Sequence, residues 1–202
     1  MNTTNELLPE VRAARSTAYP VSPAILNRWS PRAFQEKEVP EDELFALFEA
    51  ARYAPSANNE QPWRYVFART KADREAFWTF INEGNRSWCE RAPVLALLAA
   101  KRTSSTSGKP MRTYAFDAGS SWALLAAEAA SRGLATHAMG GFDALKAKET
   151  LGIPDDYEPM IVIAIGYRGD PAMLTEGQRE REQPSGRKPL EEIAMEGAFR
   201  ER

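Results

Sequence analysis

Cysteine and histidine are almost absent from this chain of 202 residues, which has one of each, Cys89 and His137. A single cysteine cannot close a disulfide bond within the chain, and one histidine beside it cannot complete a zinc cluster. We therefore expect no metal site, and the scarcity of cysteine favours a cytoplasmic protein. His137 stands in an apolar stretch, where we expect a structural role instead of a catalytic one.

Long apolar runs and an excess of charge of either sign are also missing. The longest strongly apolar run, Ala92–Ala100, is too short to cross a bilayer, and Met1–Arg15 lacks the apolar core of a signal peptide. The formal net charge is −2, so no general basic field indicates binding to nucleic acid. We expect a protein that uses neither a membrane nor a nucleic acid as its partner.

Motifs that bind nucleotides through the backbone are a third absence. No Gly-x-Gly-x-x-Gly follows an expected strand, and no Gly-x4-Gly-Lys-Ser/Thr occurs. A Gly-x-Ser-x-Gly nucleophile elbow is missing as well. A cofactor that carries phosphate would therefore have to be held mainly by side chains.

Short helices and strands alternate along the chain, which indicates a mixed α and β class. Apolar spacing and β-branched runs predict helices over 41–53, 71–82, 117–132 and 144–151, and strands over 63–69, 94–99, 134–139 and 160–167. The helix from 117 has small side chains nearly all round, so we expect it to be buried in the core or at a subunit interface. Residues 101–112 predict a mobile loop. Residues 1–24 show little periodicity and are interpreted as an arm before one domain over 25–202.

Two arginines and a serine lie within five positions in Arg28-Trp29-Ser30-Pro31-Arg32. Guanidinium groups offer paired N–H donors to phosphate oxygens, and a serine hydroxyl adds another donor. The same pattern also occurs on solvated surfaces, so both interpretations stay open for this segment alone. Two interpretations also stay open for Arg187, which is either a third phosphate ligand or a solvated charge near the C-terminus.

Amides and glycines form further candidate segments. Residues 55–63 are dense in Asn and Gln, whose paired donor and acceptor suit the pyrimidine edge of a flavin, although a polar turn explains them equally well. Asn85 is either a ligand of the same kind or a turn residue. Gly140 and Gly141 allow a flat ligand to approach the backbone, or they form a tight turn before a helix that Asp143 caps.

Taken together and in order, these segments resemble the FMN-dependent nitroreductase family. The similarity covers about residues 25–195. It rests on Arg28-x-Ser30-x-Arg32-x-Phe34, Pro55-Ser56-x-x-Asn59-x-Gln61-Pro62-Trp63, Gly84-Asn85-x-x-Trp88 before Ala92-Pro93, Gly140-Gly141-Phe142-Asp143, Leu151-Gly152-Ile153-Pro154, Ile165-Gly166-Tyr167 and Arg187-Lys188-Pro189-Leu190-Glu191-Glu192. The resemblance implies an α+β fold with a mixed central sheet flanked by helices, assembled as an intertwined homodimer with FMN at the interface.

The resemblance also implies a role for each motif. Arg28, Ser30 and Arg187 would hold the phosphate, and Arg32 would reach the ribityl chain or the N1/O2 edge of the ring. Asn85 would contact the pyrimidine, and Gly140 and Gly141 would present N–H groups near N5 and O4. The other subunit would supply Ser56, Ala57 and Asn59, while Trp29, Pro55 and Gln61 complete the cofactor-binding candidates. No role follows for residues 1–24.

The function implied is that of an oxidoreductase. NAD(P)H would deliver hydride to FMN, and a nitroaromatic, a quinone or a related small electrophile would then take it in a ping-pong sequence. A flavin carries its own redox chemistry, so we expect no dedicated catalytic side chain. Two alternatives stay open: a flavin-dependent dehydrogenase or other specialised flavin transformation, and an FMN-binding protein without turnover.

Overall fold

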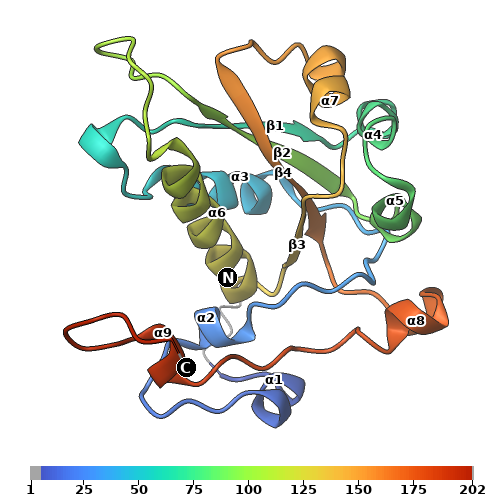
Figure 1. Ribbon diagram of the computed structural model, residues 1–202. Coiled ribbons are helices and arrows are strands. Elements are labelled where there is room, and N and C mark those ends of the chain that lie inside the picture. The colour runs from blue at the N-terminus through green and yellow to red at the C-terminus, as the bar shows by residue number, and fades with distance from the viewer. Residues whose placement is uncertain (1–5, 202) are drawn as a thin grey trace.

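The computed structural model describes residues 6–201 and contains a four-stranded sheet with helices on both faces (Figure 1). The strands are β1 (Trp63–Ala68), β2 (Val94–Lys101), β3 (Ala135–Met139) and β4 (Tyr157–Gly166), in the order β1-β2-β4-β3. All three neighbouring pairs are antiparallel. The α+β class is confirmed, but the mixed sheet that the resemblance implied is not seen among the described residues. Strand direction depends on how each connection returns to the sheet, which residue types within a strand do not encode.

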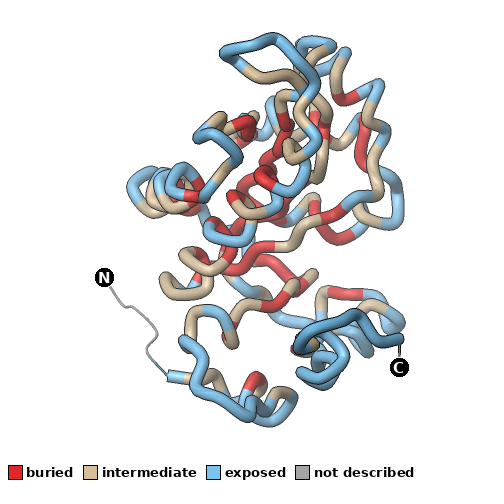
Figure 2. Tube along the Cα trace, turned by 60° about the vertical axis from the view of Figure 1, so that its left-hand side comes forward, coloured by how far each residue is buried: buried red, intermediate tan, exposed pale blue. Residues whose placement is uncertain are grey.

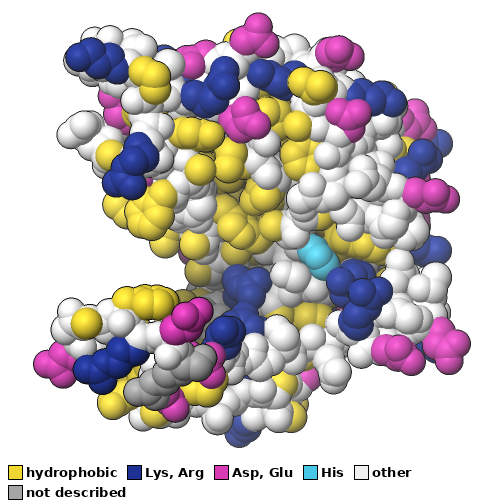
Figure 3. Space-filling model, viewed as in Figure 1, with side chains coloured by type: hydrophobic (Ala, Val, Ile, Leu, Met, Phe, Trp, Pro, Cys, Tyr) yellow, Lys and Arg dark blue, Asp and Glu magenta, His cyan; other side chains and the backbone are white. Residues whose placement is uncertain are grey.

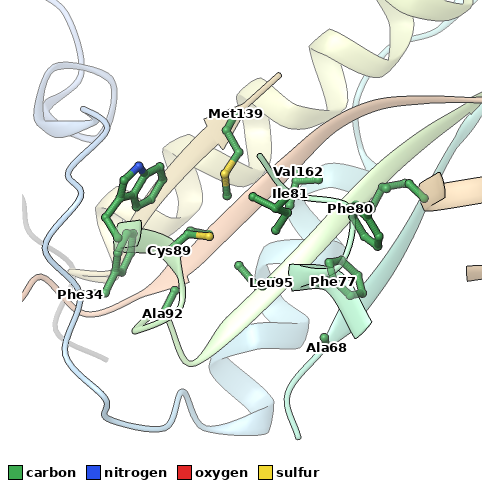
Figure 4. Close-up of a cluster of buried hydrophobic side chains, with 14 of the residues drawn as sticks. Phe34, Ala68, Phe77, Phe80, Ile81, Cys89, Ala92, Leu95, Met139 and Val162 are labelled. Atoms are coloured by element: carbon green, nitrogen blue, oxygen red, sulfur yellow. The ribbon is translucent and has the colours of Figure 1, made fainter. Parts of the chain in front are cut away.

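The centre of the sheet explains why β2 shows no alternation of apolar and polar residues. Its side chains point alternately to the two faces, as they must in a strand. Leu95 and Leu97 enter a core with Phe34, Phe77 and Phe80, which Figure 4 shows around α4 and α5. Val94, Ala96 and Leu98 enter a second core on the other face, with Leu44, Leu47 and Leu125. Both faces are covered, so β2 is apolar from Val94 to Ala100 and ends in the half-buried Lys101.

Nine α-helices are assigned within residues 6–201. They are α1 (Pro9–Ala14), α2 (Pro23–Asn27), α3 (Glu41–Arg52), α4 (Lys71–Trp78), α5 (Glu83–Cys89), α6 (Tyr114–Ser131), α7 (Ala144–Leu151), α8 (Glu176–Arg179) and α9 (Leu190–Ile193). The expected cap of α7 is confirmed, because Asp143 accepts from the Lys146 N–H, and Gly152 ends the helix with a φ of 63°. No helix in the described part of the chain is both long and apolar enough to cross a bilayer.

The largest boundary difference lies between α4 and α5. The predicted helix over 71–82 ends at Trp78, because the chain turns there and pairs Ile81 with Phe142 in an isolated bridge. Phe80 and Ile81 are buried outside the helix, so their apolar character reflects the core and not a helical face. The separate helix α5, which was not expected, then carries Asn85.

Segments from both ends of the chain lie together below α6 and β3. Figure 1 shows α1, α2, α8 and α9 in this lower part, and Figure 2 shows that most of its trace is exposed. Figure 3 shows a hollow between this part and the main body, with apolar and Lys/Arg side chains along it. The division into an arm over 1–24 and a domain over 25–202 stays a prediction, although the described arm residues pack against the domain.

Candidate functional site

The first group of candidate residues meets at the end of α2. The Arg28 Nη1 atom lies 3.4 Å from the Ser30 Oγ atom. Burial lowers the pKa of Arg28, and the nearby charge of Arg187 lowers it further. The structure thus brings Arg28 and Ser30 into contact, and it places the exposed Arg187 near enough for its charge to act on Arg28. Trp29 is buried, with the Arg168 guanidinium 5.0 Å from its ring centroid, so it packs between elements.

Arg15 joins this group, although nothing in the sequence singled it out. Its Nη1 atom donates to the carbonyl oxygens of Leu26 and Arg28, the latter at 2.9 Å, and its Nε atom donates to the Ser185 carbonyl oxygen at 3.0 Å. Its Nη2 atom is buried without an acceptor. Local pattern carries no signal for such a residue, because its partners are brought close only by folding.

No carboxylate in the described part of the chain neutralises these three arginines. Within residues 6–201, none of the ion pairs includes Arg15, Arg28 or Arg187. The charges of Arg28 and Arg187 both lower the pKa of Arg15, after the larger effect of its burial. Gathering like charges costs free energy unless an anion binds among them. The donor set therefore fits a phosphate group.

Arg32 is held through its backbone by the C-terminal segment. The Arg32 N–H lies 2.8 Å and 2.9 Å from the two carboxylate oxygens of Glu182, and the Ala33 N–H donates to the same carboxylate at 2.9 Å. Burial lowers the pKa of the Arg32 side chain, with a further contribution from Arg181. Glu182 is another residue that sequence reasoning missed, since it lies 150 positions from Arg32.

We expect Glu182→Gln to destabilise this segment modestly. The amide keeps one acceptor oxygen but loses the charge that strengthens the bonds from Arg32 and Ala33, so the free energy of unfolding should fall by about 1–2 kcal/mol. Urea unfolding followed by circular dichroism measures the change. Glu180→Gln is the control, because Glu180 is exposed and its side chain makes no hydrogen bond in the described structure. Equal midpoints for the two variants would contradict the assignment.

A second group forms where α5 meets the end of β3. The Asn85 Nδ2 atom donates to the Gly141 carbonyl oxygen at 3.1 Å, and the Asn82 N–H donates to the same oxygen at 3.1 Å. A Cβ atom on Gly141 would lie 2.5 Å from Asn85 Nδ2, whereas one on Gly140 would meet nothing within 4 Å. Of the two positions, only 141 favours glycine because a neighbouring side chain, that of Asn85, lies close to its Cα atom.

His137 connects the two groups. Its Nδ1 atom lies 2.9 Å from the Pro31 carbonyl oxygen, and its ring centroid lies 4.4 Å from that of Trp88 on α5. Burial lowers the pKa of His137 to about 4, with smaller contributions from the charges of Arg32 and Arg28. The imidazole is therefore neutral at neutral pH and holds β3, α5 and the arginine segment in place.

The amide-rich loop lies elsewhere in the same chain. It contains a short 3-10 helix (Ala57–Asn59), and the φ angles of Asn58, Asn59 and Gln61 are positive. The Ala57 N–H donates to the buried carboxylate of Asp117 at 3.2 Å, and the Gln61 N–H donates to Ser56 Oγ at 3.0 Å. Pro55 is exposed beside it. Asp117, which the sequence did not single out, thus anchors this loop to the start of α6.

The length of α6 separates this loop from the arginines. Arg28 lines a cavity of about 320 Å³ together with Ala126 and Ala130, near the other end of the helix. Asp117 and Ala130 are thirteen positions apart, which at about 1.5 Å per residue is roughly 20 Å. One chain therefore does not bring Ser56, Ala57, Asn59 and Gln61 to the arginine group.

The loop over 101–112 is tied to the amide-rich loop by Glu60. The Glu60 carboxylate accepts from the hydroxyl groups of Ser104 and Ser105 and from the Ser105 N–H at 2.8 Å. These bonds, the Ser104 hydroxyl first, lower the pKa of Glu60 to about 2. The mobility of this loop stays a prediction, and Glu60 is the residue that anchors Ser104 and Ser105 of the loop.

One face of α6 is left exposed by residues 6–201. Asp117, Ser121 and Leu125 are buried, whereas the Phe116 side chain is 76% exposed and Leu124 is 38% exposed. Gly119 and Ala123 are exposed between them. The expectation was a helix buried in the core or at a subunit interface. One side of α6 is buried in the core, and the other side is an exposed apolar surface.

Comparison with known proteins identifies the family. The model of the nitroreductase family matches residues 25–167. A crystal structure of an oxidoreductase containing FMN is 40% identical, with a TM-score of 0.89 over 93% of this chain and 97% of its own. A Thermus thermophilus protein named NADH dehydrogenase is 30% identical over 85% of this chain and 93% of its own, and a Streptomyces griseus protein named as a putative NADH dehydrogenase/NAD(P)H nitroreductase is 29% identical over 72% and 84%. The arrangement of the arginine segment, Asn85 and Gly141 thus belongs to a protein of the nitroreductase family.

Proposed function

We propose that this protein is an FMN-dependent oxidoreductase that takes hydride from NADH or NADPH and reduces nitroaromatics, quinones or related small electrophiles. The observation that carries the proposal is the group of three arginines that form no ion pair with a carboxylate of residues 6–201. It lies next to a flat-ligand candidate site at Asn85 and Gly141, and His137 joins the two. The 40% identical oxidoreductase containing FMN supports the same cofactor.

The phosphate of FMN suits the arginine group by charge and by donors. A phosphate monoester carries about −1.5 to −2 charges at neutral pH, which offsets most of the positive charge of Arg15, Arg28 and Arg187. Arg28, Ser30 and Arg187 would hold it directly. Arg32 would lie toward the ribityl chain or the N1/O2 edge, where a positive side chain favours a reduced, anionic ring.

The ring would be bound by Asn85 and by the backbone at Gly140 and Gly141. Asn85 uses Nδ2 on the Gly141 carbonyl, and no described residue donates to its Oδ1, which is therefore left to accept from the pyrimidine edge. When bound, FMN supplies the hydride chemistry, so the residues of the chain bind it, orient it and shield it from water. The His137 Nδ1 atom is engaged in its hydrogen bond with the Pro31 carbonyl oxygen, so we assign His137 no role as an acid or a base.

The complete site would require a second copy of the chain. The exposed Phe116 and Leu124 on α6 favour a homodimer packed along this helix, since exposed apolar faces mark interfaces. In such a dimer, the partner's amide-rich loop would supply Ser56, Ala57 and Asn59, with Pro55 and Gln61 shaping the loop. A shared site is supported by the roughly 20 Å of helix between Asp117, which anchors this loop, and Ala130, which lines a cavity with Arg28.

Absorbance spectroscopy tests the proposal directly. We expect the purified protein, after incubation with FMN and gel filtration, to keep a flavin absorbance band that NADH or NADPH bleaches under nitrogen. A nitroaromatic or a quinone should restore the band, and initial rates with both substrates varied should give the parallel double-reciprocal lines of a ping-pong sequence. Protein that stays colourless in excess FMN would refute the cofactor. Bound FMN that neither nicotinamide bleaches would refute the reductase.

A further inference from the structure

The N-terminal arm is docked onto the segment that carries Arg28. The Leu8 N–H donates to Asn27 Oδ1 at 3.0 Å, and Asn27 Nδ2 donates to the Glu6 carbonyl oxygen at 2.8 Å. Val11 of α1 is fully buried, and Glu10 forms an ion pair with Arg168. Asn27 is itself 95% buried, and both of these bonds are partly buried. The arm therefore has a defined place beside the candidate phosphate site.

Arg15, at the end of α1, links both halves of that site. Its bonds to Leu26 and Arg28 hold the backbone on either side of Asn27, and its bond to Ser185 holds the C-terminal segment two residues before Arg187. Arg187 in turn donates from Nη1 to the Ser185 hydroxyl at 3.0 Å. One planar guanidinium thus contacts the backbone of the two segments that supply Arg28 and Arg187.

Lysine cannot reproduce this arrangement. Its ammonium group is a single compact charge, whereas the Arg15 guanidinium donates from Nη1 and Nε in fixed directions to three carbonyl groups. A charge at this place without a binding anion is unfavourable, because Arg28 and Arg187 are also positive and none of the three pairs with a carboxylate among the residues that the structure describes. The arrangement is therefore best explained by a ligand that carries the opposite charge.

We propose that Arg15 is a positioning residue of the phosphate site, which aligns Arg28 with Arg187 and makes recognition of the flavin's phosphate depend on a docked N-terminal arm. This inference rests on the proposed function, since it concerns the same site. By linkage, whatever binds only to the docked state stabilises that state. Binding of FMN therefore tightens the arm, and loss of the arm weakens binding of FMN.

Titration of the apoprotein with FMN and with riboflavin, which lacks the phosphate, tests the proposal. Flavin fluorescence is followed for wild type, Arg15→Gln, Arg15→Lys and Arg12→Gln. The control residue Arg12 lies on the same helix, is exposed, and makes no side-chain hydrogen bond or ion pair in the described structure. We expect Arg15→Gln to raise the dissociation constant for FMN about 10- to 100-fold, with an intermediate effect of Arg15→Lys. The dissociation constant for riboflavin should change less than about 3-fold, and Arg12→Gln should match wild type.

The comparison of the two flavins separates this role from a merely structural one. Equal losses for FMN and riboflavin would mean that Arg15 only supports the fold, and unchanged FMN affinity would mean that it does not serve the site at all. Either result overturns the inference while the proposed function stands. If wild type binds neither flavin, the proposed function fails first.

Hydrogen exchange of the unmodified protein provides a second test that no folding defect can obscure. Peptides covering residues 6–15 should exchange at least about 3-fold more slowly with saturating FMN than without it. Saturating riboflavin should slow them much less, because it leaves the arginines without their anion. Equal protection by both flavins, or by neither, would overturn the coupling between arm and phosphate.

Discussion

Gly141→Ala is expected to lower the free energy of unfolding by about 1 kcal/mol, roughly the contribution of the one hydrogen bond that the added methyl group displaces. The added Cβ atom would lie 2.5 Å from Asn85 Nδ2, which already donates to the Gly141 carbonyl oxygen. Either the loop moves or Asn85 leaves its hydrogen bond. Chemical denaturation measures the loss, and FMN affinity should fall with it, because both residues belong to the candidate ring site.

Two further variants identify the cause of that loss. Gly140→Ala is the matched control, since its Cβ atom meets nothing within 4 Å, and we expect it to change stability by less than about 0.5 kcal/mol. Asn85→Ala removes the atom that clashes. Gly141→Ala should therefore lower the free energy of unfolding clearly less in the Asn85→Ala protein than in wild type. If the two glycine variants are equally stable, or if the double mutant shows no relief, the close approach does not restrict this position.

The free energy of unfolding is expected to fall by about 3 kcal/mol through His137 alone as the pH drops from 6.5 to 4. The unfolded chain binds a proton at His137 near the ordinary pKa of 6.5, whereas burial in the folded protein lowers that pKa to about 4. Between these values the unfolded state holds more protons, so stability rises with pH. One pKa unit is worth about 1.4 kcal/mol, which gives the magnitude.

Denaturation curves at pH 7 and pH 4.5 for wild type and His137→Asn isolate this contribution from that of the carboxylates. Asparagine does not titrate, and its amide can still donate to the Pro31 carbonyl oxygen. The variant should be less stable than wild type at pH 7, because it loses the contact with Trp88, but it should lose less stability on acidification. The same pH dependence in both proteins would show that His137 does not remain neutral in the folded state.

Much of the fold could be predicted from local pattern. The helical spacing of Leu44 and Leu47 marked α3, the apolar run from Val94 marked β2, and Asp143 with Gly152 marked the two ends of α7. Residues 71–82 predict a single helix, because Phe77, Phe80 and Ile81 are apolar at helical spacing. Phe80 and Ile81 are buried after the chain has left the helix, which spacing alone cannot distinguish.

The candidate site divides in the same way. Arg28 with Ser30, and Asn85 with Gly141, lie in short motifs whose composition pointed to a ligand, and the structure brings each pair into contact. Arg15, Asp117 and Glu182 escaped notice, because each is an ordinary charged residue whose partner lies far along the chain. Only the folded structure shows that Asp117 and Glu182 accept hydrogen bonds from distant backbone N–H groups, and that Arg15 has a buried Nη2 atom without an acceptor.

The amino-acid sequence by itself determined the family, the alternation of helices and strands, and the residue types able to hold a phosphate and a flavin ring, since all of these are properties of short segments and their order. Only the tertiary structure decided that every strand pair is antiparallel, that the arm reaches the arginines, and that the amide-rich loop lies at the far end of α6. These are long-range relations, set by how the two cores pack against the sheet, and no stretch of neighbouring residues specifies them.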